Sequence, residues 1–191
     1  VNEKTFYRLP EYKRQELREK HGFDKDTFII TTGSRNQLRK LFPQQLEGFS
    51  IFKKENPTIK AKIIFWCSQS EGWNLKKHAE EYGLDVNDVL IAYRCRVTGE
   101  IFYRPVGRED QDNPNIQQKG SLKSVGMDNF ATEDKINEFL NLGDVFILCI
   151  TSGGFELWLS QAKLTECPTI ANAYSCFEEQ VGLEKGCLEI D

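Results

Sequence analysis

The sequence predicts an α/β protein in which a mostly parallel β-sheet is covered by helices on both faces. Short runs rich in β-branched and aromatic residues alternate with segments whose apolar residues recur at helical spacing. The runs are almost continuously apolar, which is typical of strands buried on both sides. With 191 residues, the chain is long enough for one such domain and too short for two of full size.

The first predicted strand is residues 27–32 (TFIITT), a β-branched run that ends at Gly33. Phe42, Leu46 and Phe49 then recur at i, i+4 and i+7, so they predict an amphipathic helix. This pair is the first strand-and-helix unit.

The second strand is predicted at residues 61–66 (AKIIFW) and the third at residues 89–93 (VLIAY). Residues 75–82 lie between them, have a helical composition and end at Gly83. A second strand-and-helix unit therefore leads into the third strand.

In the second half, Thr132 is predicted to cap a helix whose first turn carries Glu133 and Asp134, which are favourable near the positive end of the helix dipole. The remaining predicted elements are strands at 145–150 and 169–173, a helix at 155–166 and the start of another at 176–181. The total is about five strand-and-helix units.

Residues 95–131 interrupt this alternation and are predicted to be a polar insertion. Residues 95–103 alternate around Thr98-Gly99 and predict a small hairpin. Residues 109–126 are polar and contain several Pro and Gly residues, which predicts a flexible flap.

Composition argues against several classes of function. The net charge is −4 and the pI about 5.4, so no broad basic face exists for nucleic acid. No run approaches the roughly 18 apolar residues of a transmembrane helix, and the first residues lack the pattern of a signal peptide. We therefore expect a cytoplasmic protein without a transmembrane segment. Because the chain begins at Val1 with a polar segment, we also expect it to be part of something longer.

The cysteines and histidines do not predict a metal site. No two cysteines have the C-x-x-C spacing of a zinc site, and several lie in or beside apolar runs, so reduced, buried thiols are expected. His21 and His78 are predicted to be solvated surface residues. The six cysteines are Cys67, Cys95, Cys149, Cys167, Cys176 and Cys187.

The loop after the first strand contains Gly33, Ser34, Arg35, Arg39 and Lys40. In an open parallel sheet, ligands bind outside the carboxyl ends of the strands. Cations at the start of a helix are mildly unfavourable, so these side chains favour a bound anion such as a diphosphate. The alternative is a solvated basic turn without function.

The loop after the fourth strand contains Ser152, Gly153, Gly154, Phe155 and Glu156. Paired glycines between a strand and a helix let backbone N–H groups approach a phosphate closely. The alternative is a tight strand-to-helix turn. Both loops lie at predicted carboxyl ends, so we predict that they face one crevice.

These motifs resemble the C-terminal domain of family 4 retaining glycosyltransferases, which have the two-domain GT-B architecture. Residues 1–7 resemble the hinge into that domain, and Arg35 and Lys40 match its G-R-x-x-x-x-K motif. Further residues keep the register of its E-G-F-G-L motif and the segments around it. They are Asp144, Ser152, Gly154, Phe155, Leu157, Ala162, Pro168 and Ile170.

The resemblance implies a Rossmann-like GT-B C-terminal domain that binds a nucleotide-diphosphate-sugar donor. Residues 1–26 would be the hinge segment and leading helix, and residues 27–191 the donor-binding domain. Arg35 and Lys40 would be catalytic, offsetting the charge on the departing diphosphate. The resemblance implies no cofactor and no essential metal. Its partner would be an N-terminal acceptor domain, without which the fragment should not turn over.

The implied donor site departs from the family at two carboxylates. The first motif glutamate is Gly153 here, and the second, which binds the ribose, is Gln161. The loop at Tyr93 and Arg94 would contact the base. The implied donor-binding set is Gly33, Ser34, Arg35, Lys40, Arg94, Ser152, Gly153, Gly154, Phe155, Glu156 and Gln161.

Two alternatives to a glycosyltransferase stay open. The first is a non-catalytic, regulatory or nucleotide-sugar-binding module with a degenerate donor site. The second is another sugar-diphosphate enzyme of similar architecture, such as an epimerase. The sequence does not choose the base, sugar, acceptor or linkage.

Overall fold

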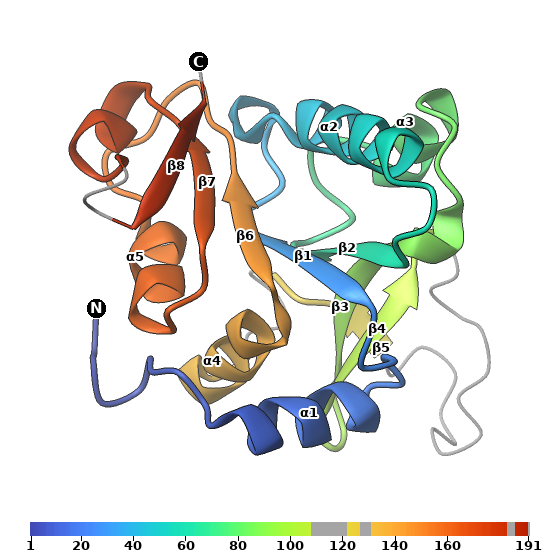
Figure 1. The fold of residues 1–191 in the computed structure, drawn as a ribbon, viewed down its shortest axis with the longest axis vertical. Coiled ribbons are helices and arrows are strands. Elements are labelled where there is room, and N and C mark those ends of the chain that lie inside the picture. The colour runs from blue at the N-terminus through green and yellow to red at the C-terminus, as the bar shows by residue number, and fades with distance from the viewer. Residues whose placement is uncertain (108–121, 127–130, 183–185, 191) are drawn as a thin grey trace.

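The computed structural model describes residues 1–107, 122–126, 131–182 and 186–190, and its described strands form one sheet (Figure 1). The strands are β1 (Phe28–Gly33), β2 (Ala61–Trp66), β3 (Val89–Cys95), β4 (Ile101–Pro105), β5 (Leu122–Ser124), β6 (Val145–Leu148), β7 (Thr169–Asn172) and β8 (Cys187–Ile190). Their order is β4-β3-β2-β1-β6-β7-β8, with β5 also paired to β3. All neighbours are parallel except β4 and β5, which are antiparallel to β3. The predicted α/β class is confirmed.

Helices cover both faces of the sheet, as predicted. The α-helices are α1 (Glu11–Lys20), α2 (Phe42–Glu55), α3 (Leu75–Glu81), α4 (Glu133–Leu142) and α5 (Leu157–Leu164). In Figure 1, α2 and α3 lie above the strands, and α1 and α4 lie below them. Phe42 and Phe65 belong to one buried core, whereas Phe139 and Phe146 belong to the other. No helix in the described ranges is long and apolar enough to cross a membrane.

Three sequence predictions are wrong in detail. The helix expected from residue 176 is a short 3-10 helix, η3 (Ser175–Glu179), and β8 follows it unpredicted. Strand β5 lies in the segment expected to be a flap, because Leu122–Ser124 pairs with β3. Thr132 occupies the N-cap position of α4 but makes no side-chain capping bond. The hairpin predicted at 95–103 is confirmed by the β3–β4 pairing. The rest of the predicted flap lies outside the described residues.

The histidine prediction is also wrong, because both imidazoles are half-buried. His21 packs edge-on against Tyr103, with ring centroids 4.8 Å apart. Burial lowers the pKa of His21 to about 4, and the positive charges of Lys20 and Lys135 add to the effect. His78 packs edge-on against Trp73, with ring centroids 5.5 Å apart.

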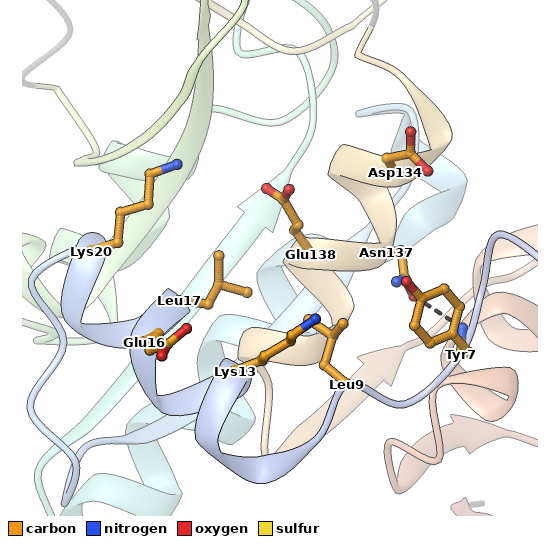
Figure 2. Close-up of a pocket in the computed structure, with 9 residues that line it drawn as sticks. All are labelled: Tyr7, Leu9, Lys13, Glu16, Leu17, Lys20, Asp134, Asn137 and Glu138. Carbon is orange, nitrogen blue, oxygen red and sulfur yellow. Dashed lines mark hydrogen bonds between the residues drawn. The ribbon is translucent and has the colours of Figure 1, made fainter.

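The N-terminal segment is bound to α4 through side-chain amides. The N–H of Tyr7 donates to Oδ1 of Asn137 at 3.2 Å, and the N–H of Leu9 donates to Oδ1 of Asn141 at 2.9 Å. Figure 2 shows the first of these bonds, beside a hollow of about 400 Å³ between α1 and α4. None of the sequence-predicted site residues lines this hollow.

Helix α1 is fixed to the end of α4 by two buried arginines. Arg14 donates to the carbonyl oxygens of Asn141 and Gly143, at 2.9 and 3.0 Å. Arg18 donates twice to the carbonyl oxygen of Leu142, at 3.0 and 2.8 Å, and lies 2.6 Å from Oδ2 of Asp144. We call this cluster of Arg14, Arg18, Asp144 and the last carbonyls of α4 the amino-edge junction, since Asp144 directly precedes β6.

Candidate functional site

The two predicted anion-binding loops meet at the point where the strand order reverses. Successive strands proceed from β1 towards β3 in one direction and from β6 towards β8 in the other, so the topological switch point lies between β1 and β6. The N–H of Thr151, after β6, donates to the carbonyl of Arg39, after β1, at 2.9 Å. The predicted adjacency of the two loops is therefore confirmed. We call the two loops together, residues 33–40 at and after the end of β1 and residues 149–156 after β6, the switch-point crevice.

The loop after β1 is held by the loop after β2. The side chain of Asn36 accepts from the N–H of Trp73 and donates to its carbonyl, both at 2.9 Å. The indole N–H of Trp73 donates to the carbonyl of Leu38 at 3.2 Å. Gly72 has a φ of +61°, and a Cβ there would strike the backbone of Asn36. These contacts fix the backbone that carries the predicted cations.

Lys40 is buried and forms an ion pair with Glu156, which is the N-cap residue of α5. The side chains are only 4% and 10% exposed. A buried ammonium is costly unless a counter-charge accompanies it, and the carboxylate of Glu156 supplies that charge. The Lys40 predicted to grip a diphosphate therefore contacts an anion of the protein itself.

Arg35 also contacts a carboxylate, but at the surface. Its Nε lies 2.8 Å from Oε2 of Glu71, and the side chains are 51% and 31% exposed. Such an exposed pair is worth about 0–1 kcal/mol and exchanges readily with another anion. Arg39 is exposed, and no carboxylate within the described part of the chain pairs with it.

An apolar cavity of about 270 Å³ opens beside Ser34 and Arg35. Trp66 and Trp158 line it, with ring centroids 6.1 Å apart, and Glu71 also contributes to its lining. A Cβ on Gly33 would come within 2.6 Å of the Trp158 ring, so glycine lets the indole pack against the end of β1. No sequence motif indicated that these two tryptophans line a cavity.

The loop after β6 is only partly available to a ligand. The N–H and the carbonyl of Gly153 bond to the hydroxyl of Ser175, at 3.3 and 3.0 Å. Ser152, Gly154 and Phe155 are exposed. The amides of Gly154 and Phe155 make no hydrogen bond within the described residues, so they are free to donate.

Two residues of the implied donor set, Arg94 and Gln161, lie within regular elements and not in the two loops. Arg94 lies at the end of β3, and its Nη2 approaches the hairpin turn at Gly99. Gln161 is buried within α5. Neither residue lines the cavity beside Arg35. Tyr93 does reach the carboxyl edge, since its hydroxyl donates to Oε1 of Gln69 at 2.7 Å.

The cysteines are all free, and five of the six are buried, as predicted. Cys176 is half-buried at the crevice. Burial raises the pKa of its thiol, and the negative charge of Glu156 raises it further. Burial also raises the pKa of Cys149 to about 11. Both thiols stay protonated at neutral pH and are poor nucleophiles. Among the described residues, no three His, Cys, Asp or Glu side chains are grouped to hold a metal ion.

Comparison with known proteins gives matches in structure only. No protein-family model and no curated protein matches the chain. The C-terminal domain of LpcC, a glycosyl transferase group 1 family protein from Francisella tularensis, matches with a TM-score of 0.65 and 16% identity, over 100% of this chain and 80% of that one. HepE from Anabaena, solved in complex with UDP-glucose, matches with a TM-score of 0.66 and 14% identity, over 100% and 41%.

The fold also occurs in a protein named for another reaction. The N-terminal domain of trehalose-6-phosphate phosphatase from Candida albicans matches with a TM-score of 0.55 and 15% identity, over 94% of this chain and 33% of that one. The chain spans about two fifths of HepE and one third of this phosphatase structure. It has the fold of the C-terminal domain of GT-B glycosyltransferases.

Proposed function

From this fold, we propose that the domain binds the nucleotide-diphosphate-sugar donor of a glycosyltransferase. Transfer of the sugar would also require an N-terminal acceptor domain. The observation that carries the proposal is the meeting of two loops at the switch point, where Arg35 lines an aromatic cavity and Arg39 and Lys40 follow in the same loop. A structural neighbour, HepE, was solved with UDP-glucose, which supports this class of ligand.

The donor diphosphate would lie against the cationic loop after β1. Arg35 would exchange Glu71 for a phosphate oxygen, and the free amides of Gly154 and Phe155 would donate to another. In the reaction, Arg35 and Lys40 would stabilise the charge that accumulates on the departing diphosphate. The proposal assigns that role to these side chains, without an essential metal ion.

The base of the donor nucleotide would enter the cavity that Trp66 and Trp158 line. Both indoles line the cavity, and offset or edge-on contacts with an aromatic ring are favourable there. The cavity adjoins Arg35, so one ligand can contact the guanidinium and the indoles together.

Titration of the chain with UDP-, GDP- and ADP-sugars by calorimetry tests this proposal. One of them should bind, and Arg35→Ala should weaken that ligand about tenfold, the loss of one charge-assisted contact. Arg96→Ala, on the exposed turn of the hairpin, is the matched control and should bind like the wild type. If none of the sugar nucleotides binds, the donor-site proposal is wrong.

A non-catalytic binding module is the second candidate. It is favoured by Gly153, which offers no side chain to the sugar, and by the pairing of Lys40 with Glu156. Such a module would bind the sugar nucleotide without transferring the sugar. Product analysis of the domain joined to its acceptor domain separates the two, since only the enzyme releases a nucleoside diphosphate as acceptor is glycosylated.

A further inference from the structure

We propose that the carboxylate of Glu156 is a built-in competitor for the anionic ligand of the switch-point crevice. A diphosphate can contact Lys40 only after this carboxylate has moved away. The inference concerns the same crevice as the proposed function, but it needs only that the crevice binds a phosphate-type anion.

The first observation is the position of Glu156. It is the N-cap residue of α5, where the helix dipole favours an anion. Its side chain makes no capping bond and turns to the ammonium of Lys40 instead. The carboxylate thus lies where the helix end and the buried cation both attract negative charge, a combination that also suits a phosphate.

The second observation is the space beside Gly153. A Cβ at this position would come within 2.7 Å of Oε1 of Glu156 and within 3.3 Å of Sγ of Cys176. A side chain at 153 and the carboxylate of Glu156 therefore cannot occupy their places together. Gly153 is not among the glycines with a positive φ, so a Cβ there would be opposed mainly by this carboxylate and not by the backbone conformation.

The two ion pairs of the crevice differ in how they respond to a ligand. Glu71 holds an exposed guanidinium and can move into water at little cost. Glu156 holds a buried ammonium, and its removal leaves a positive charge that water solvates poorly. Displacement of Glu156 is therefore the step that limits anion affinity.

Binding of inorganic pyrophosphate and UDP to the 191-residue chain, measured by calorimetry, tests the inference. Glu156→Gln keeps the shape of the side chain and removes its charge, so both probes should bind at least about tenfold more tightly, since a charge-assisted contact to Lys40 is gained. Glu47→Gln, an exposed carboxylate on α2, is the control and should leave affinity unchanged.

A second variant should displace the carboxylate of Glu156 from Lys40 by steric contact, while every charge of the protein is kept. Gly153→Ala places a Cβ against Oε1 of Glu156 and should push the carboxylate away from Lys40, again tightening pyrophosphate binding several-fold. Gly48→Ala is its control, because a Cβ there meets no atom within 4 Å. Thermal unfolding of each variant verifies that the comparison is made between folded proteins.

The outcomes separate this inference from the donor-site proposal. Tighter pyrophosphate binding by Glu156→Gln and Gly153→Ala supports it even if no sugar nucleotide binds. If the wild type binds a sugar nucleotide and Glu156→Gln binds the same ligand more weakly, Glu156 is a ligand contact and the competitor role is wrong. Unchanged pyrophosphate affinity in both variants also overturns it.

Discussion

The amino-edge junction and the switch-point crevice both bury cations beside a carboxylate, yet they are built differently. At the junction, Arg14 and Arg18 donate to three carbonyl oxygens at the end of α4 as well as facing Asp144. In the crevice, the ammonium of Lys40 contacts one carboxylate, that of Glu156.

The difference indicates which cluster is structural and which can exchange partners. Arginine at a helix C-terminus satisfies carbonyls that have no partner within the helix, and its charge matches the negative end of the dipole. Lys40 lies near a helix N-terminus, where a cation is unfavourable without an anion. Backbone carbonyls cannot leave the arginines, whereas a side-chain carboxylate can leave the lysine.

The largest predicted effect is on stability at the junction. Arg18→Met should lower the free energy of unfolding by about 3–5 kcal/mol. It removes the cation beside the half-buried carboxylate of Asp144 and leaves the carbonyl of Leu142 without its donor. Urea denaturation measures the change, with Arg96→Met as an exposed control. A loss below about 1 kcal/mol would show that the junction is no more structural than a surface pair.

Acid should lower the free energy of unfolding through His21, which directly follows α1 and so lies on the side of the amino-edge junction. The pKa of His21 is about 4 in the folded protein and 6.5 when unfolded, so the unfolded chain binds the extra proton between these values. Stability is therefore complete above pH 6.5 and falls as the pH drops towards 4, by about 2 kcal/mol at pH 5. Urea denaturation at pH 7.5 and 5 measures this loss.

His21→Phe keeps a ring against Tyr103 and removes the titrating group, so this part of the pH dependence should disappear. An equal loss at pH 5 in the variant would assign the effect to other groups. Because His21 directly follows α1, the test separates acid sensitivity of the junction side from that of the crevice.

In the crevice, the effect on stability should be smaller and partly reversible by a second change. Lys40→Met leaves the carboxylate of Glu156 without its cation and should cost about 1–3 kcal/mol. Adding Glu156→Gln removes that charge and should recover most of the loss. Urea denaturation of the two single variants and the double variant gives the coupling energy, and simple additivity would contradict the pairing.

The sequence predicted most of the fold because its strands are buried and therefore apolar. Residues 61–66 were predicted as a strand with the bounds that β2 has. Strand β8 was missed because it is an edge strand with three of its four residues exposed, so its sequence lacks that apolar signal.

The site was predicted less completely for a physical reason of a different kind. Arg35 and Lys40 were recognised from local spacing, but their carboxylate partners lie 36 and 116 residues away in the chain. Sequence spacing reports neighbours along one helix or loop, and only the sheet order brings Glu71 and Glu156 to these cations. The cations could be predicted, whereas their neutralisation could not.

The smallest predicted effect on stability is at the exposed pair of the crevice. Arg35→Ala should change the free energy of unfolding by less than about 1 kcal/mol, because water already solvates both partners. The same variant should still weaken a phosphate ligand, so the two measurements on one protein would diverge. A large loss of stability would instead place Arg35 with Arg14 and Arg18 as a structural cation, and the division between junction and crevice would no longer hold.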